Sequence, residues 1–223
     1  MTSPTTPDIA HAEPLEIIEI KDSSGTLQQR VTMLNGELHG LAEMYSQGRL
    51  TEASEYKHGK LDGLTTIYEK EGVLQQTIFY QEGKKHGLSE VYVKGDLYAR
   101  IPYEEGLIHG TSIYYAVSGR KASEIQYKKG KIDGLFIFYL EDGSPASIAE
   151  YKEDKPHGYE TTYYGKDKVM THKYFQNGKQ EGKSVTFAED GKILEVSHYK
   201  DGLLLGPAVS FDADGKLKKS TGL

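Results

Sequence analysis

Apolar and polar residues alternate along short stretches of this chain, and glycine-containing turns separate the stretches. Leu74, Ile78 and Tyr80 are apolar and polar residues stand between them, as expected for a half-buried β-strand. A second kind of strand is an apolar run such as residues 135–139. No segment has a sustained apolar stripe with a period of 3.6 residues, so the pattern predicts strands and almost no helix.

Turn signals follow the apolar runs directly. Asp142-Gly143 and Asp190-Gly191 are dipeptides typical of β-hairpin turns. The chain therefore reads as a series of hairpins.

An internal repeat organises almost the whole chain. The phrase aromatic-x-x-Gly-x-x-x-Gly recurs every 23 or 24 residues. Its second glycines are Gly40, Gly63, Gly87, Gly110, Gly134, Gly158, Gly182 and Gly206. A second aromatic slot lies five residues after each of them, and a turn residue follows three or four residues later. All glycines except Gly165 and Gly222 occupy one of three repeat positions, so most glycines have a structural role.

These repeats predict an all-β fold. In each repeat one strand runs from the second glycine through the second aromatic, and the double-glycine phrase is the return turn. About eight hairpins, paired with their neighbours, would form an elongated, single-layer, twisted antiparallel sheet, a solenoid in which ladders of aromatic residues supply the main packing. We expect residues 1–14 to be a disordered tail and residues 15–223 to be the repeat domain.

The repeat resembles the MORN repeat (membrane occupation and recognition nexus), and most closely its bacterial variant. The segment Tyr56-Lys57-His58-Gly59-Lys60-Leu61-Asp62-Gly63, which continues to Tyr68, carries the resemblance. The resemblance covers roughly residues 25–219. The chain departs from it at Asp154 in a glycine slot and at Met33 in an aromatic slot.

The resemblance implies a binding function. Bacterial proteins built from the variant repeat are often antitoxins of the YwqK type, and similar chains are immunity proteins that neutralise a toxic effector. Eukaryotic MORN proteins are linked to membranes and phosphoinositides.

Composition excludes several functional classes. The 223 residues include no cysteine, which rules out disulfides, thiol nucleophiles and thiolate metal sites. The net charge of −6 favours neither nucleic acid nor an anionic lipid surface as a partner. The longest apolar run, 135–140, is far too short for a membrane helix. Because no signal sequence is recognisable, we expect a cytoplasmic protein, or a periplasmic one if a signal was removed.

Two columns of polar residues resemble binding sites. The slot before the second glycine holds His39, Asp62, His86, His109, Asp133, His157, Glu181 and Leu205. Equivalent residues of successive hairpins are about 10 Å apart, too far to share a metal ion, so we interpret them as turn residues. A row of Lys60, Lys84, Lys131, Lys155 and Lys179 would suit phosphate groups, but acidic residues lie two positions away and favour solvated turns.

No catalytic motif is recognisable. The chain has no nucleophile elbow, phosphate-binding loop, zinc-protease motif or dinucleotide fingerprint. A single-layer sheet also offers little enclosed volume for a reaction. We therefore expect a protein that is not an enzyme and needs no cofactor.

Several large aromatic residues fall outside the repeat slots. Phe79, Phe136 and Phe138 point away from the repeat aromatic of their own strand. We predict a partner-binding band formed by Phe79, Tyr98, Tyr114, Phe136 and Phe138. The alternative is that these residues fill a second packing ladder.

The leading hypothesis is a protein-binding module, specifically an immunity or antitoxin protein that occludes a toxic effector. The first alternative is a membrane- or lipid-associated scaffold, for which a basic stripe would be the signal. The second is a structural, adhesin-like array, for which a secretion signal would be expected.

Overall fold

Every regular element of the described chain is a β-strand. The computed structural model describes residues 14–218, so the predicted tail, apart from Pro14, lies outside the described residues. The chain divides into two units, Met1–Lys84 and Lys85–Leu223, and in each of them hairpins follow one another in an open antiparallel sheet. The prediction of an all-β fold made of repeated hairpins is confirmed. Within residues 14–218 no helix has the length and apolarity needed to span a membrane.

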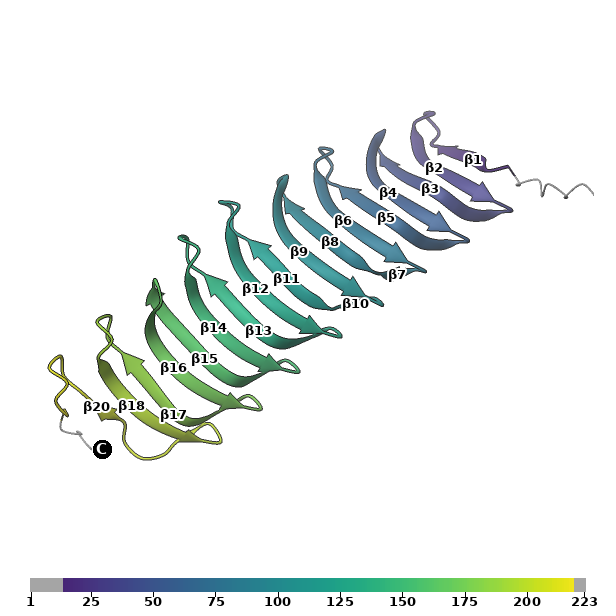
Figure 1. Ribbon diagram of the computed structural model, residues 1–223. Coiled ribbons are helices and arrows are strands. Elements are labelled where there is room, and N and C mark those ends of the chain that lie inside the picture. The colour runs from purple at the N-terminus through teal and green to yellow at the C-terminus, as the bar shows by residue number, and fades with distance from the viewer. Residues whose placement is uncertain (1–13, 219–223) are drawn as a thin grey trace, which may run out of the picture. The chain divides into compact units, whose positions relative to one another are not determined.

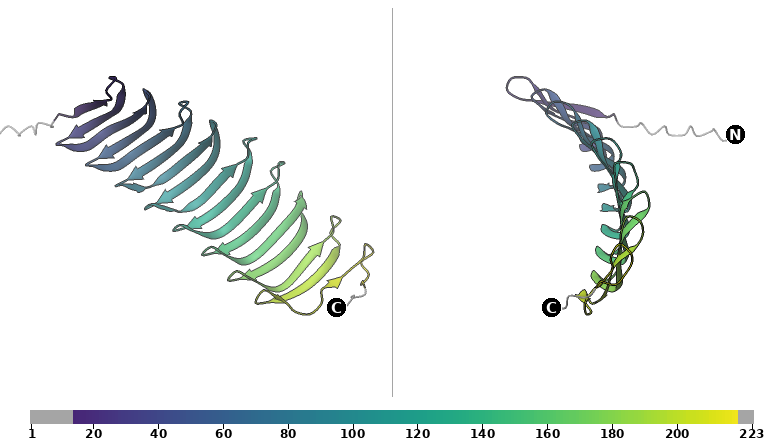
Figure 2. Two further views of the ribbon diagram at one scale, coloured as in Figure 1. Left: turned by 180° about the vertical axis from the view of Figure 1, so that it is seen from behind. Right: turned by 90° about the vertical axis from the view of Figure 1, so that its left-hand side faces the viewer.

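Consecutive hairpins of each unit lie side by side, and their strands are bowed along their length (Figures 1 and 2). The strands of unit 1 are β1 (Glu16–Lys21), β2 (Leu27–Leu34), β3 (Glu37–Ser46), β4 (Arg49–Lys57), β5 (Lys60–Tyr68) and β6 (Leu74–Gln81). The two residues of β7 (Lys84–Lys85) stand where the chain passes from one unit to the other. The strands of unit 2 are β8 (Gly87–Val93), β9 (Asp96–Glu104), β10 (Leu107–Ile108), β11 (Gly110–Tyr115), β12 (Lys121–Lys128), β13 (Lys131–Tyr139), β14 (Pro145–Lys152), β15 (Lys155–Gly165), β16 (Lys168–Gln176), β17 (Lys179–Phe187), β18 (Ile193–Lys200), β19 (Leu203–Leu204) and β20 (Val209–Ser210).

The return turns are tighter than the sequence predicts. Only the first glycine of the phrase lies in the turn, together with the residue before it. At His58-Gly59 both φ angles are positive, 50° and 74°, as in the type I′ turn that suits twisted hairpins. The strands consequently begin directly after the first glycine, as β5 does at Lys60.

In most repeats the second glycine belongs to a strand and not to the turn; Gly206 lies outside the strands. Gly63 faces Tyr80 on the neighbouring strand, and Gly134 faces Tyr151 in the same way. Gly63 has a φ of 124°, and a side chain at this position would clash with the carboxylate of Glu55. That carboxylate passes beside the glycine and accepts a hydrogen bond from the Leu64 amide at 3.3 Å.

Turns at the opposite ends of the strands explain the two repeat lengths. Gln47-Gly48 and Lys94-Gly95, in the 23-residue repeats, are two-residue turns with both φ angles positive. The turn at Gly143 is longer: its amide donates to the Leu140 carbonyl at 2.9 Å, and only the glycine has a positive φ. The 23-residue repeats are therefore one residue shorter in the turns at Gly48 and Gly95, as predicted.

The two aromatic slots of a repeat lie on opposite faces of the sheet. Gly63 and its partner Tyr80 share one face, and Tyr68, five residues after Gly63, points to the other because side chains alternate along a strand. We call the first the ladder face; it carries the first-slot aromatics Tyr56, Tyr80, Tyr103, Tyr127, Tyr151, Phe175 and Tyr199. We call the other the reverse face; it carries the second-slot aromatics Tyr45, Tyr68, Tyr92, Tyr115, Tyr139, Tyr163 and Phe187.

Small residues, not aromatic rings, are the most deeply buried. The largest fully buried side chains are Ser54, Ser89 and Ser112. The ladder aromatics are only half-buried, for example Tyr56 and Tyr127. A sheet without a second layer covers a short side chain with its neighbours on the same face, but it cannot cover a whole ring. The expectation that aromatic ladders replace a core is therefore only partly right.

We predict that Gly63→Ala destabilises the protein more than Gly59→Ala. Both positions have positive φ, which costs a residue with a Cβ about 1–2 kcal/mol. Open space surrounds Gly59, whereas a Cβ at Gly63 would also displace the Glu55 side chain. Urea unfolding midpoints of the two variants measure the difference, and equal midpoints would contradict the proposed role of the second glycine.

Candidate functional site

Four of the five predicted aromatic residues form two ring pairs on neighbouring strands of the ladder face of unit 2. The Tyr98 and Tyr114 rings lie 6.0 Å apart, and the Phe136 and Phe138 rings lie 4.6 Å apart. Ser123 separates the two pairs, since it faces Tyr114 on one side and Phe138 on the other. We call these four aromatic residues the aromatic band.

The aromatic band is partly open to solvent. Tyr98 is 47% exposed and Phe138 is 48% exposed, while Tyr114 and Phe136 are half-buried. Phe136 is held in place by a neighbour, because its ring centre lies 5.9 Å from that of Tyr151 on the same face. The band therefore has a fixed base and two exposed rings, which is the usual arrangement of anchor residues in protein interfaces.

Phe79 is not part of the aromatic band. It lies on β6 in unit 1, where it faces Leu64 on the reverse face, and it is exposed. The prediction of one band of five residues is wrong in this respect. The prediction assumed that the two aromatic slots share one face. Phe79 points away from Tyr80, which lies on the ladder face, whereas Phe138 points away from Tyr139, which lies on the reverse face.

A hollow that the sequence analysis missed adjoins Tyr98. Its volume is about 470 Å³, and Val93, Leu97, Tyr115 and Val117 contribute to its lining. Val117 is 97% exposed, because it stands in the turn between β11 and β12. The signal in the sequence that points to this hollow is a valine in a turn position that holds Lys70, Glu141 and Glu189 in other repeats.

Tyr127 of the ladder face contacts Tyr114 of the aromatic band. Burial and the neighbouring Tyr114 hydroxyl raise the pKa of Tyr127 to about 12. Tyr127 therefore remains neutral well above the pH at which a free tyrosine ionises.

The column of histidine and acidic residues joins successive return turns. Asp62 accepts a hydrogen bond from the Glu82 amide of the next turn at 3.1 Å, and Glu181 accepts one from the Asp201 amide at 2.9 Å. His157 Nδ1 accepts one from the Asn177 amide at 3.4 Å. Within residues 14–218, no group of three or more histidine and acidic residues is placed to hold a metal ion.

The lysine row pairs with acidic residues of the next repeat. Lys60 contacts Glu82 at 3.0 Å, and Lys179 contacts Asp201 at 3.2 Å. Lys131 contacts Glu153 at 3.6 Å in the same manner. Acidic partners neutralise these three lysines, so they do not form a free basic stripe.

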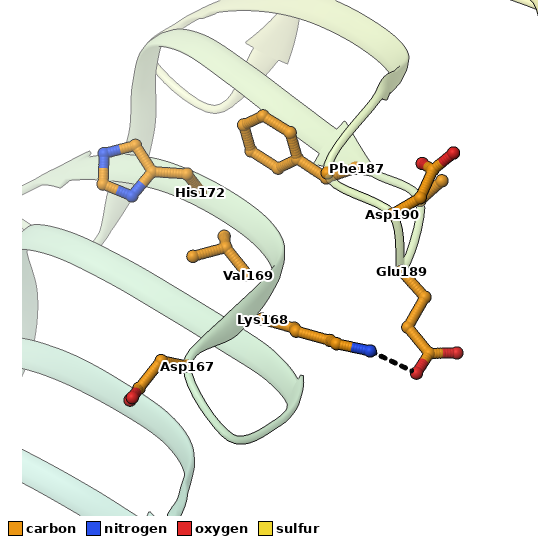
Figure 3. Close-up of a pocket in the computed structure, with 9 residues that line it drawn as sticks. Asp167, Lys168, Val169, His172, Phe187, Glu189 and Asp190 are labelled. Atoms are coloured by element: carbon orange, nitrogen blue, oxygen red, sulfur yellow. Dashed lines mark hydrogen bonds and ion pairs between the residues drawn. The ribbon is translucent and has the colours of Figure 1, made fainter.

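A groove lies on the reverse face of unit 2. Two hollows of about 680 Å³ and 400 Å³ share His172. In the larger one, His172, Val169 and Phe187 surround one opening, and an ion pair between Lys168 and Glu189 stands at its rim (Figure 3). The repeat pattern does not predict this groove, because its aromatic wall combines repeat and non-repeat residues.

We predict that the protein loses stability as the pH rises from about 10 to about 12. In this range Tyr127 is protonated in the folded state and ionised in the unfolded state, so folding is linked to proton binding. The Tyr127→Phe variant should show a smaller loss, measured as the change of the urea midpoint between pH 9 and pH 11. An identical loss in both proteins would contradict the raised pKa of Tyr127.

Comparison with known proteins places a known repeat in this chain. A family model described as a MORN repeat variant matches residues 132–153 and 180–201. These segments contain the hairpins β13–β14 and β17–β18. No curated protein matches the sequence. The matches do not extend to the YwqK-type antitoxin identity, which stays a prediction. Two hairpins of unit 2 are thus MORN repeat variants, and such repeats suggest a repeat-based binding module.

Proposed function

We propose that this chain is a non-enzymatic protein-binding module whose docking surface is the aromatic band of unit 2. The observation that carries the proposal is the half-exposure of Tyr98 and Phe138 on a base of packed rings. Neither ring belongs to a repeat slot, so the hairpins do not require them. Aromatic residues with this exposure are enriched among the residues that dominate interface energies.

The adjoining hollow supports a protein partner. Tyr98 lines it together with Tyr115 of the reverse face, and Val117 adds a fully exposed apolar side chain at the strand ends. A partner that inserts an apolar side chain here would cover Tyr98 and Val117 together. This would remove contiguous apolar surface from water, which is the main favourable term in protein association.

We further propose that the partner is a toxic effector, and that the protein acts as an immunity or antitoxin protein by covering the effector's active site or substrate entrance. The bacterial style of the repeat motivates this step. Binding by occlusion needs an extended, preformed surface and no catalytic group. A paired sheet with few mobile connections supplies such a surface at a small entropic cost.

Charge distinguishes this proposal from the alternative of a lipid scaffold. The net charge is −6, and three lysines of the basic row are paired with acidic residues. Binding to anionic lipid would be expected to use unpaired basic residues near the membrane surface.

The test is a pulldown from native cell lysate with mass spectrometry, using the wild type and the Tyr98→Ala/Phe138→Ala variant. Loss of one anchor worth about 2 kcal/mol weakens binding about 30-fold, so loss of both should weaken it by at least that factor. Phe79→Ala is the matched control, since it removes an equally exposed ring outside the band. It should retain the partner.

The outcomes separate the proposals. A stoichiometric partner that poisons cells when expressed alone, and that the double variant fails to retain, would support both binding and immunity. A partner without toxicity would overturn the immunity role and leave the binding role. Loss of the partner in Phe79→Ala alone would overturn the site. Capture of anionic lipid without a protein partner would favour the scaffold.

A further inference from the structure

The reverse-face groove of unit 2 runs along two neighbouring strands. Tyr174 and His172 on β16 and Val185 on β17 line the smaller hollow; Val169 and Phe187 line the larger one. Both hollows contain His172, so they lie on either side of this side chain, and we call them together the groove. It lies on the face opposite to the aromatic band, so the two surfaces are separate.

One pair of facing residues distinguishes this groove from the β2–β3 hairpin. At the equivalent place in the β2–β3 hairpin, Arg30 faces Glu43, and the two side chains form an ion pair at 3.2 Å beside Tyr45. In the β16–β17 hairpin, His172 faces Val185 in the same register. Histidine and valine are shorter than arginine and glutamate, so the space over Phe187 stays open.

The walls of the groove are aromatic and apolar. Tyr159 stacks on His172 with ring centres 4.8 Å apart, and its ring lies 5.1 Å from Tyr174. Val185, which is 7% exposed, forms the floor. At the turn end, Figure 3 shows Asp190 pointing away from the opening. The charges at this rim are the paired Lys168 and Glu189 and the carboxylate of Asp167, which also lines the hollow.

The opposite end of the groove carries a lysine. Lys183 lines the smaller hollow and faces His198 across the strand pair. Its side chain is exposed and has no ion-pair partner among residues 14–218. An anionic group seated beside Lys183 would gain electrostatic attraction and leave no buried charge unpaired.

We propose that this groove binds an extended segment of a partner protein that carries an acidic residue and a bulky apolar residue about four positions apart. Lys183, Val185 and Phe187 occupy every second position of β17 and so share one face. Lys183 and Phe187 are four residues apart, which is about 13 Å along a strand. An extended segment lying along β17 would place its acidic side chain at Lys183. Its apolar side chain would then fill the hollow between Val169, His172 and Phe187.

This proposal does not rest on the aromatic band or on an immunity role. A partner docked on the ladder face would leave the groove free. The control for independence is therefore the Tyr98→Ala/Phe138→Ala variant, which should bind the groove ligand like the wild type.

The experiment is selection from a phage-displayed library of random nine-residue peptides on the immobilised full chain. The enriched peptides should carry Asp or Glu about four positions from Phe, Leu or Met. The His172→Arg/Val185→Glu variant rebuilds the ion pair of the β2–β3 hairpin and fills the groove. It should retain these peptides at least about tenfold less. Its circular dichroism spectrum should match the wild type.

A second variant keeps the test decisive if the filled variant fails to fold. Lys183→Glu changes only an exposed side chain, and selection on it should enrich peptides with Lys or Arg in place of the acidic residue. The absence of enriched peptides, or enrichment without the paired acidic and apolar residues, would overturn the proposal. Equal retention by the folded, filled variant would overturn it as well.

Discussion

The pairing of a glycine with an aromatic ring on the adjacent strand is the constraint on which the rest of the structure depends. Gly63 opposite Tyr80 leaves room for the Glu55 side chain to pass beside the glycine and reach the Leu64 amide. The same arrangement recurs where Gln126 passes Gly134 and accepts a hydrogen bond from the Leu135 amide at 2.9 Å. Since each such contact joins two strands of one hairpin, it fixes the register of that hairpin without a second layer.

Neighbouring repeats are then joined at both ends of the strands. At the return turns, the Gly130 amide donates to the Ile108 carbonyl of the preceding repeat at 2.8 Å. At the other turns, Lys168 pairs with Glu189 and Lys192 donates to the Ala213 carbonyl at 2.8 Å. These contacts are local and solvated, and each adds little free energy. They stabilise the sheet because they recur at each junction between neighbouring repeats.

How much of this follows from the sequence can be judged from particular residues. The period, the hairpins and the turns at Gly48 and Gly143 are predictable, because glycine is needed wherever φ is positive. The side on which Phe79 emerges was misjudged, although the odd spacing of five residues between Gly63 and Tyr68 already places the two aromatic slots on opposite faces. The reverse-face groove was not predicted, since it depends on which side chains are absent across a strand pair.

Binding surfaces arise on such a scaffold in two physical ways. On the ladder face, Phe136 adds a ring at a position where other repeats have small or polar residues such as Ser112 and Thr65, and Phe138 adds one where other repeats have Ile67 and Val91. On the reverse face, His172 and Val185 stand where the β2–β3 hairpin has Arg30 and Glu43, and a hollow lies over the aromatic slot of Phe187. Both changes spare the glycines and the turn residues that hold the hairpins. Recognition can therefore change from repeat to repeat while the glycine–aromatic pairing keeps the sheet intact.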